Sequence, residues 1–516
     1  MASTFTSMFD QFERRAELHP DVTCLSFQDR AWSWGQMRNR ILKAAGALDA
    51  MGVKAGDRIA FIDKNHAACL ELTLAASLIG ASHVVVNFRL SLEELSHVLS
   101  DSDAKLLITG HEFLPQIRGI QDQLPALKRV LVLGGENDEY EAVVEGAPPL
   151  AKRHQAEPDD CFLQLYTSGT TGWPKGALLT QKSMSAHNET VRNAYAMDEA
   201  AVNLVAMPLF HVGGTSWALA GMAAGARTVL VREVNAAHVL DRISQEQATH
   251  AFFVPAVIQM LLAEENVVAD TASLRVIGYG GSPMPAPLME RILNTLDTPL
   301  YSVYGMTEMS GVFCVLGPDE HRDPKRKYLH ASAGRAVPGV EVRVVDPSTR
   351  EDVPTGDVGE FWLRSGQAMS GYWHQPEASE AAFVDGWLRT GDAGRLDDDG
   401  YLFIEDRVKD MVISGGENIY PAEVERVLVE HPAVEEVAII GIPHQKWGET
   451  IHAVVTTKDG QSTSERELID YCRERLAHYK CPTGISFVLA LPKNPTGKLL
   501  KRKLREDYGG LVPHVS

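Results

Sequence analysis

One eleven-residue segment concentrates the residue types that bind phosphate groups. Residues 166–176 read Tyr-Thr-Ser-Gly-Thr-Thr-Gly-Trp-Pro-Lys-Gly, directly after the apolar run 161–165. Glycines allow the backbone to approach a polyphosphate, hydroxyls and amides donate to its oxygens, and Lys175 adds a positive charge. The Gly-Lys-Ser/Thr ending of a Walker loop is absent. A flexible turn is the alternative, but the density of these residues favours a polyphosphate-binding loop.

The same string resembles the phosphate loop of the adenylate-forming (AMP-binding) superfamily, which includes acyl-CoA synthetases, peptide-synthetase adenylation domains and beetle luciferases. Further segments that resemble family motifs follow in the family's order, and the resemblance runs from about residue 10 to about residue 505. These segments are 207–214, 280–283, 301–309, 390–392 with 406–407, 411–421 and 492–498. The resemblance implies the acyl-CoA synthetase or fatty-acid–CoA ligase branch.

The resemblance also implies which residues bind ATP. Tyr304 would stack on adenine, and Thr307 would contact the α-phosphate. Asp392 would bind the ribose hydroxyls, and Arg407 the ribose or phosphate. Glu308 would hold Mg²⁺ together with Thr171, since Mg²⁺ prefers few carboxylates plus phosphates and water. The ATP- and AMP-binding residues implied are Thr167, Ser168, Gly169, Thr170, Thr171, Gly172, Lys175, Gly280, Gly281, Ser282, Tyr304, Gly305, Met306, Thr307, Asp392, Arg407 and Lys498.

The segment around His211 implies an acyl pocket, because family members place an aromatic residue or a histidine at this wall. Taken alone, a histidine between phenylalanine and valine is more often a buried core residue. We do not expect it to act as a base, since a carboxylate nucleophile is already ionised at neutral pH. Apolar walls and the lack of a prominent Arg or Lys predict a hydrophobic acid, short to medium or ring-bearing, rather than a diacid. The pocket candidates are His211, Val212, Gly213, Gly214, Trp217, Tyr279, Gly280, Gly305 and Met309.

The resemblance implies two half-reactions. A carboxylic acid attacks ATP to give an acyl-adenylate and pyrophosphate, and the CoA thiol then takes the acyl group with release of AMP. Lys498 would reach the ATP in the first step, and Lys409 would be the hinge about which a small domain rotates. The CoA-binding residues would be Ser414, Gly415, Gly416 and Glu417. The catalytic residues would be Lys498, Glu308, Thr307, Lys175 and Lys409.

Three alternatives to a CoA ligase stay open at this point. The chain could be a freestanding enzyme that loads a separate carrier protein, a luciferase, or a catalytically inactive nucleotide-binding regulator. Intact Lys498, Glu308 and phosphate-loop residues speak against the inactive regulator, and nothing in the sequence favours a luciferase.

Alternating helix and strand patterns must position these residues. Capping-box spacing at Ser33 and Gln36 predicts a helix start, and the apolar run 58–62 predicts a buried strand. Further strands are expected at 83–86, 106–109, 130–133, 228–231, 251–254 and 275–279. The fold class is therefore α/β. Residues 1–408 would form a large N-terminal domain of two parallel-sheet subdomains plus a β-rich subdomain, and residues 409–516 a small mobile α+β domain with its hinge at Lys409.

Length, charge and cysteine spacing limit the function further. The 516 residues exceed one compact core, and a net charge of −19 argues against nucleic-acid binding and against an anionic membrane surface. No two of the six cysteines lie two or three residues apart, so zinc pairs are not expected and a reducing compartment is. The pattern shows neither a signal peptide nor a transmembrane segment, so we expect a cytoplasmic enzyme. The oligomeric state is not readable, and a homodimer is left open.

Overall fold

The computed structural model describes residues 6–167, 173–414, 417–444, 447–493 and 499–510, without the side chains of Lys409, Glu417 and Asn418. The chain forms two compact units. The first comprises Met1–Glu341 with Leu363–Leu388, and the second comprises Val342–Trp362 with Arg389–Ser516. The domain boundary expected at residues 408–409 stays a prediction.

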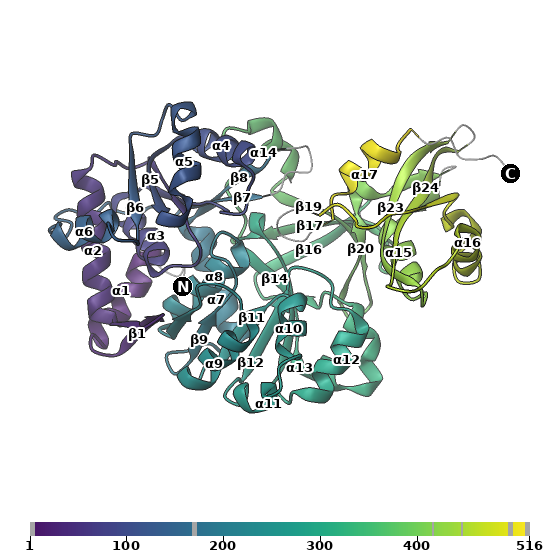
Figure 1. Cartoon of the computed structure of the whole chain (residues 1–516), viewed down its shortest axis with the longest axis horizontal. Helices are drawn as coiled ribbons and strands as arrows, with labels where there is room; N and C mark the ends of the chain where they lie inside the picture. Colours follow the sequence, from purple (N-terminus) through teal and green to yellow (C-terminus); the bar gives the residue numbers. More distant parts are fainter. Residues whose placement is uncertain (1–5, 168–172, 415–416, 445–446, 494–498, 511–516) are drawn as a thin grey trace. The chain divides into compact units, whose positions relative to one another are not determined.

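A six-stranded sheet in the first unit carries the phosphate-loop segment (Figure 1). Its strand order is β6 (Arg129–Leu133), β5 (Ala104–Gly110), β3 (Arg58–Ile62), β4 (Ser82–Val85), β7 (Cys161–Thr167) and β8 (Lys175–Thr180). All neighbours are parallel except β8, which runs antiparallel to β7. Four of the five residues of β3 are buried, as a strand covered on both faces requires. The helices of this part are α1 (Met8–Leu18), α2 (Trp34–Ala50), α3 (Ala67–Ile79), α4 (Leu92–Asp101), α5 (Leu114–Ile120) and α6 (Glu139–Gly146).

A nine-stranded sheet forms the other half of the first unit. Its order is β15 (Arg335–Ala336), β14 (Gly311–Leu316), β13 (Leu300–Met306), β12 (Val276–Gly280), β11 (His250–Phe253), β9 (Val202–Val205), β10 (Arg227–Leu230), β1 (Thr23–Phe27) and β2 (Arg30–Ser33). The strands from β13 to β1 are parallel, and β2, β14 and β15 are antiparallel to their neighbours. Its helices are α7 (Gln181–Ala194), α8 (Val212–Ala224), α9 (Ala236–Glu246), α10 (Pro255–Leu261), α11 (Val267–Asp270), α12 (Ala286–Thr295) and α13 (Pro318–Arg322).

A five-stranded sheet spans the chain from Val340 to Arg407. Its order is β16 (Val340–Val345), β17 (Gly359–Ser365), β19 (Trp387–Leu396) and β18 (Phe383–Val384), with β20 (Leu402–Arg407) also paired to β19. Helix α14 (Pro376–Ala382) precedes β18. The division between the two compact units passes within β16, β17 and β19. The sheet confirms the β-rich region expected from the sequence.

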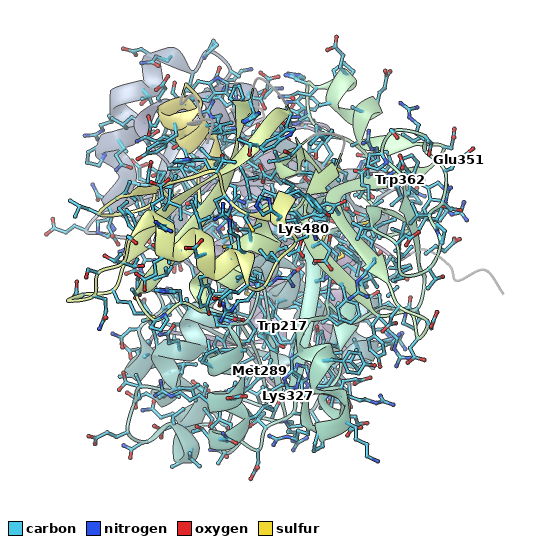
Figure 2. All side chains as sticks on the ribbon, turned by 90° about the vertical axis from the view of Figure 1, so that its right-hand side faces the viewer. Trp217, Met289, Lys327, Glu351, Trp362 and Lys480 are labelled. Atoms are coloured by element: carbon cyan, nitrogen blue, oxygen red, sulfur yellow. The ribbon has the colours of Figure 1, made fainter. Side chains whose placement is uncertain are left out.

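The last hundred residues build a smaller α+β structure around a second five-stranded sheet. Its order is β22 (Glu417–Ile419), β21 (Val412–Ser414), β24 (Gly448–Thr457) and β23 (Val434–His444), with β25 (Gly484–Phe487) parallel to β24. The helices are α15 (Pro421–Val429), α16 (Glu465–Arg473) and α17 (Lys501–Tyr508). Val424, Ile439 and Leu468 are fully buried in their shared core. Lys480, labelled in Figure 2, forms an ion pair with Glu423 of α15 at 2.7 Å.

The predicted α/β fold class is confirmed, with two parallel-sheet halves, a β-rich region and a C-terminal α+β part. The capping box expected from Ser33 and Gln36 opens α2, and the strand expected at 58–62 is β3. Strands β1 and β2 were not predicted from the sequence. In the part of the chain that the structure describes, no helix combines the length and apolar character needed to cross a bilayer.

Candidate active site

The predicted phosphate loop joins two antiparallel strands. β7 ends at Thr167 and β8 begins at Lys175, and these two residues are direct partners across the strand pair. β7 also pairs with β4 on its other edge, which buries the apolar run before the loop. The hairpin therefore fixes both ends of the predicted loop. The loop residues that lie outside the described ranges are Ser168, Gly169, Thr170, Thr171 and Gly172.

Gly176, the last residue of the motif, lies against two side chains of this hairpin. A Cβ at this position would lie 2.6 Å from Gln164 Nε2 and 3.1 Å from Tyr166 Cζ. The Tyr166 hydroxyl donates to Asp101 Oδ2 at 2.6 Å. Burial, and then the hydrogen bond to Asp101, raises the pKa of Tyr166. Tyr166 therefore fixes β7 against α4 and is protonated at neutral pH.

Glu308, the predicted Mg²⁺ ligand, and Lys175 share one neighbour. Thr307–Met309 form a 3-10 turn, η3, directly after β13. The Tyr372 hydroxyl donates to Glu308 Oε1 at 2.8 Å, and Lys175 Nζ lies 5.3 Å from the centroid of the same tyrosine ring. The structure thus brings two of the predicted charged groups together around Tyr372. This tyrosine was missed from the sequence, where its only signal is an aromatic pair after Gly371.

The donor set at Glu308 fits a Mg²⁺ ion that arrives with the phosphates of a nucleotide. Within the ranges that the structure describes, no group of three or more His, Cys, Asp or Glu side chains could hold a metal ion by itself. Mg²⁺ is usually held by one or two carboxylates, while phosphate and water oxygens complete its octahedron. Among the described residues, no Lys or Arg forms an ion pair with Glu308, so its negative charge is not neutralised by the protein there.

Two neighbouring parallel strands end at the residues predicted to bind adenine. β12 ends at Gly280 and β13 at Met306, and ligands of α/β sheets commonly bind at such carboxyl ends. A Cβ at Gly280 would lie 2.5 Å from Val303 Cγ2, and one at Gly305 would lie 2.5 Å from the Gly311 carbonyl oxygen. Strand packing therefore requires glycine at both positions, whatever binds there. Gly281, with φ of +81°, and Ser282 follow β12, and the Tyr304 ring packs on Phe313.

The predicted wall of the acyl pocket opens helix α8. His211 is the N-cap residue, and its ring lies 4.5 Å from that of Phe210. Burial, with a smaller effect of Arg89, lowers the pKa of His211 to about 4, so the ring is neutral at neutral pH. Val212 and Gly213 follow in the first turn, and a Cβ at Gly214 would overlap the Pro208 carbonyl oxygen.

The remaining pocket candidates are buried. Trp217, labelled in Figure 2, donates its indole N–H to the Leu204 carbonyl at 3.1 Å. The Tyr279 hydroxyl lies 2.8 Å from His321 Nε2, and His321 Nδ1 lies 2.5 Å from the Gly317 carbonyl oxygen. His321 must donate from Nδ1 to that carbonyl, so its Nε2 accepts from the tyrosine. Met309 is fully buried.

The second unit carries the other predicted nucleotide-binding residues. Asp392 and Arg407 are partners on β19 and β20, and Arg407 Nε donates to Asp392 Oδ1 at 2.6 Å. The Asp406 carboxylate accepts the backbone N–H of Ala422, so it caps the start of α15. Ser414 is buried at the end of β21. Predicted residues outside the described part are Gly415, Gly416 and Lys498, together with the side chains of Lys409 and Glu417.

Comparisons with known proteins identify the family. The AMP-binding enzyme family matches residues 12–373, and the AMP-binding enzyme C-terminal domain matches residues 423–498. Fatty acid–[acyl-carrier-protein] ligase ScoC of Streptomyces coeruleorubidus is 37% identical over 506 residues, 96% of this chain and 95% of that protein. Feruloyl-CoA synthase of an Amycolatopsis species is 38% identical over 503 residues, 96% of this chain and 98% of that protein. The crystal structure of the anthranilate CoA ligase AuaEII with anthranoyl-AMP matches with a TM-score of 0.86 at 31% identity, covering 98% of this chain and 97% of that one. The chain therefore belongs to the AMP-binding enzyme family, as an adenylate-forming ligase that joins carboxylic acids to CoA or carrier-protein thiols.

Proposed function

We propose that the chain is an ATP-dependent carboxylic acid–CoA ligase. The acid carboxylate attacks the α-phosphorus of ATP, the bond to the bridging oxygen breaks, and pyrophosphate leaves. The CoA thiol, losing its proton, then attacks the carbonyl carbon of the acyl-adenylate, and AMP leaves. The observation that carries this proposal is the placement of Lys175 and Glu308 around Tyr372, beside the phosphate-loop hairpin.

The first half-reaction brings two anions together, so its main requirements are charge neutralisation and positioning. Lys175 and Lys498 are the lysines proposed to neutralise the phosphates. Glu308 and Thr171 would hold Mg²⁺, which when bound supplies further positive charge to the phosphate oxygens. His211 is neutral because burial lowers its pKa to about 4, and the ionised substrate needs no base.

CoA is the proposed thiol because segment 411–421 resembles the segment that lines the pantetheine tunnel in the family, and because the feruloyl-CoA synthase aligns with nearly the whole chain. A carrier-protein thiol is the second candidate, favoured by the equally long match to ScoC. Both thiols end in the same phosphopantetheine arm, so the second half-reaction would use the same residues. The residues that would contact that arm are Ser414, Gly415, Gly416 and Glu417.

The proposed acid is hydrophobic and short to medium in length or ring-bearing. The buried Trp217, Tyr279 and Met309 would form an apolar wall of its pocket. Two of the similar proteins, the feruloyl-CoA synthase and the anthranilate CoA ligase, are named for acids with aromatic rings. ATP-dependent pyrophosphate release over a panel of acids graded in length and ring content tests this class. Release that requires both acid and ATP would exclude the inactive regulator, and thioester yield with CoA against a phosphopantetheinylated carrier would decide the acceptor.

Lys498→Ala tests the division of labour between the half-reactions. We expect the rate of pyrophosphate release to fall at least about a hundredfold, the scale of losing one electrostatic contact in a transition state. Thioester formation from a supplied acyl-adenylate should survive, because no phosphate is displaced from ATP in that step. Lys493→Ala is the matched control, since Lys493 lies five residues earlier in the sequence and is paired with Glu436. Equal loss of both half-reactions in Lys498→Ala would contradict this assignment.

A further inference from the structure

The short segment 369–373, between β17 and α14, is hydrogen-bonded to both the phosphate-loop hairpin and η3. It follows the edge of β8 in extended form, and Tyr372 pairs with Ala177 as an antiparallel bridge. Backbone hydrogen bonds hold it on each side. These run from Ser370 N to Leu178 O (3.0 Å), Leu178 N to Gly371 O (2.9 Å), Trp373 N to Gly176 O (2.8 Å) and Met369 N to Glu308 O (2.8 Å). The segment therefore fixes the spacing between the strand that carries Lys175 and the turn that carries Glu308.

The Tyr372 side chain contacts both charged groups with different parts of its ring. Its hydroxyl donates to Glu308 Oε1 at 2.8 Å, and Lys175 Nζ lies over its ring, 5.3 Å from the ring centroid. A hydroxyl stabilises a carboxylate as a hydrogen-bond donor, and an aromatic face attracts an ammonium through its quadrupole. Among the described residues, neither Lys175 nor Glu308 forms an ion pair. Tyr372 therefore contacts both of the charged groups that would serve the phosphates and Mg²⁺.

Further contacts anchor Tyr372 and the residue that follows it. Its backbone N–H donates to Ser379 Oγ at 2.8 Å. The next residue, Trp373, donates its indole N–H to the Asp101 carbonyl at 3.0 Å, and the Arg58 guanidinium lies 3.3 Å from the centre of its ring. Groups whose supports are fixed before the ligand arrives cost no reorganisation during the reaction.

We propose that Tyr372 is a positioning residue of the adenylation step, which orients the Glu308 carboxylate and keeps it from pairing with Lys175. This inference rests on the proposed function. Neither the hydroxyl nor the ring of Tyr372 needs to touch the reacting atoms. Its effect is to present one negative and one positive group separately to the nucleotide.

The test compares two substitutions that each remove one hydroxyl-to-carboxylate hydrogen bond. Tyr372→Phe keeps the ring against Lys175 and loses the bond to Glu308. Tyr140→Phe is the matched control, because the Tyr140 hydroxyl donates to Glu71 at 2.5 Å in a buried network elsewhere in the fold. The readouts are the kcat and acid KM of pyrophosphate release, the Mg²⁺ dependence of ATP binding by calorimetry without acid, and the Tm.

For Tyr372→Phe we expect kcat to fall about tenfold, as loss of a hydrogen bond to a charged group implies, with the acid KM within about twofold. The Mg²⁺ concentration that half-saturates ATP binding should rise severalfold, because Glu308 loses its fixed orientation. Tyr140→Phe should leave kcat and the Mg²⁺ dependence unchanged. Tyr372→Leu should be worse than Tyr372→Phe, since it also frees Lys175 to pair with Glu308.

The outcomes separate this inference from the proposed function. If the wild-type chain releases no pyrophosphate with any acid, the proposed function fails. If the wild-type chain is active and Tyr372→Phe matches Tyr140→Phe in kcat, only the positioning role fails. A lower kcat with an unchanged Mg²⁺ dependence would also overturn that role, because Tyr372 would then support the fold rather than Glu308.

Discussion

At the scale of single residues, the glycines separate what a sequence can tell from what it cannot. Gly280 and Gly305 are among the residues predicted to line the acyl pocket, where the missing side chain of glycine would leave room. The structure shows that β-strand neighbours already occupy the positions of the missing Cβ atoms. A glycine in the sequence can thus mark a place where another group approaches the backbone closely, but it does not tell whether that group is a ligand or another strand. Their role in the pocket stays a prediction.

Gly311 offers a sharp test of such packing. It has φ of +136°, and a Cβ there would overlap Nε2 of the fully buried His187 and lie 3.0 Å from Ser216 Oγ. Gly311→Ala should therefore cost about 3 kcal/mol of unfolding free energy, from overpacking plus backbone strain. Gly52→Ala is the control, since Gly52 has φ of +83° but no neighbour within 4 Å, and should cost about 1 kcal/mol. Denaturant unfolding measures both, and equal losses would show that His187 simply moves aside.

At the scale of elements, local patterns predicted strands and helices but not their distant partners. The run 58–62 reads as a buried strand because nearly all of its residues are apolar, and Ser33 with Gln36 reads as a helix start because both groups of a capping box are present. No local periodicity indicates that β1 pairs with β10, about two hundred residues later. The same holds for Tyr372, whose contacts with Lys175 and Glu308 join segments far apart in the chain. Lys175 and Glu308 could thus be proposed from their motifs in the sequence, whereas Tyr372, which contacts both, could not.

The turn at Lys409 supports a prediction about the second half-reaction. Val408–Asp410 form a 3-10 turn, and the Met411 N–H donates to the Arg407 carbonyl at 3.1 Å. Proline fixes φ near −65°, so Lys409→Pro should restrict rotation at a hinge. We expect pyrophosphate release within about threefold of wild type and thioester formation slowed at least about tenfold, since domain closure limits many enzymes. Lys409→Ala removes the charge but not the rotation and serves as the control. Single-turnover measurements separate the steps, and an unchanged second step in Lys409→Pro would remove the hinge.

At the scale of the whole molecule, the predicted residues divide between the two compact units. The phosphate-loop ends, Glu308 and the acyl-pocket candidates belong to the first unit, while Asp392 and Arg407 belong to the second. Stability is a second property of the whole molecule, and it depends on how many ionisable groups folding removes from water.

Histidines that folding removes from water make the stability of the first compact unit depend on pH. Burial lowers the pKa to about 3 for His66, His83 and His187, and to about 4 for His211 and His321. An unfolded histidine titrates near pH 6.5. Between pH 6.5 and about 4, these histidines therefore bind protons in the unfolded chain but not in the folded chain. The unfolding free energy falls as the pH falls. Each such histidine should lower it by about 1.4 kcal/mol at pH 5.5 relative to pH 7.5.

His187→Leu isolates one of these contributions. Neither ring nitrogen of His187 has a hydrogen-bond partner in the described part of the chain, so leucine removes a titrating group without breaking a bond. Denaturant unfolding should show that the variant loses about 1.4 kcal/mol less than wild type between pH 7.5 and pH 5.5. The contribution of the carboxylates to the pH dependence cancels in this comparison, because they titrate alike in the wild type and the variant. Parallel pH profiles would mean that His187 gains a proton in the folded state, which its burial beside Gly311 leaves no water to stabilise.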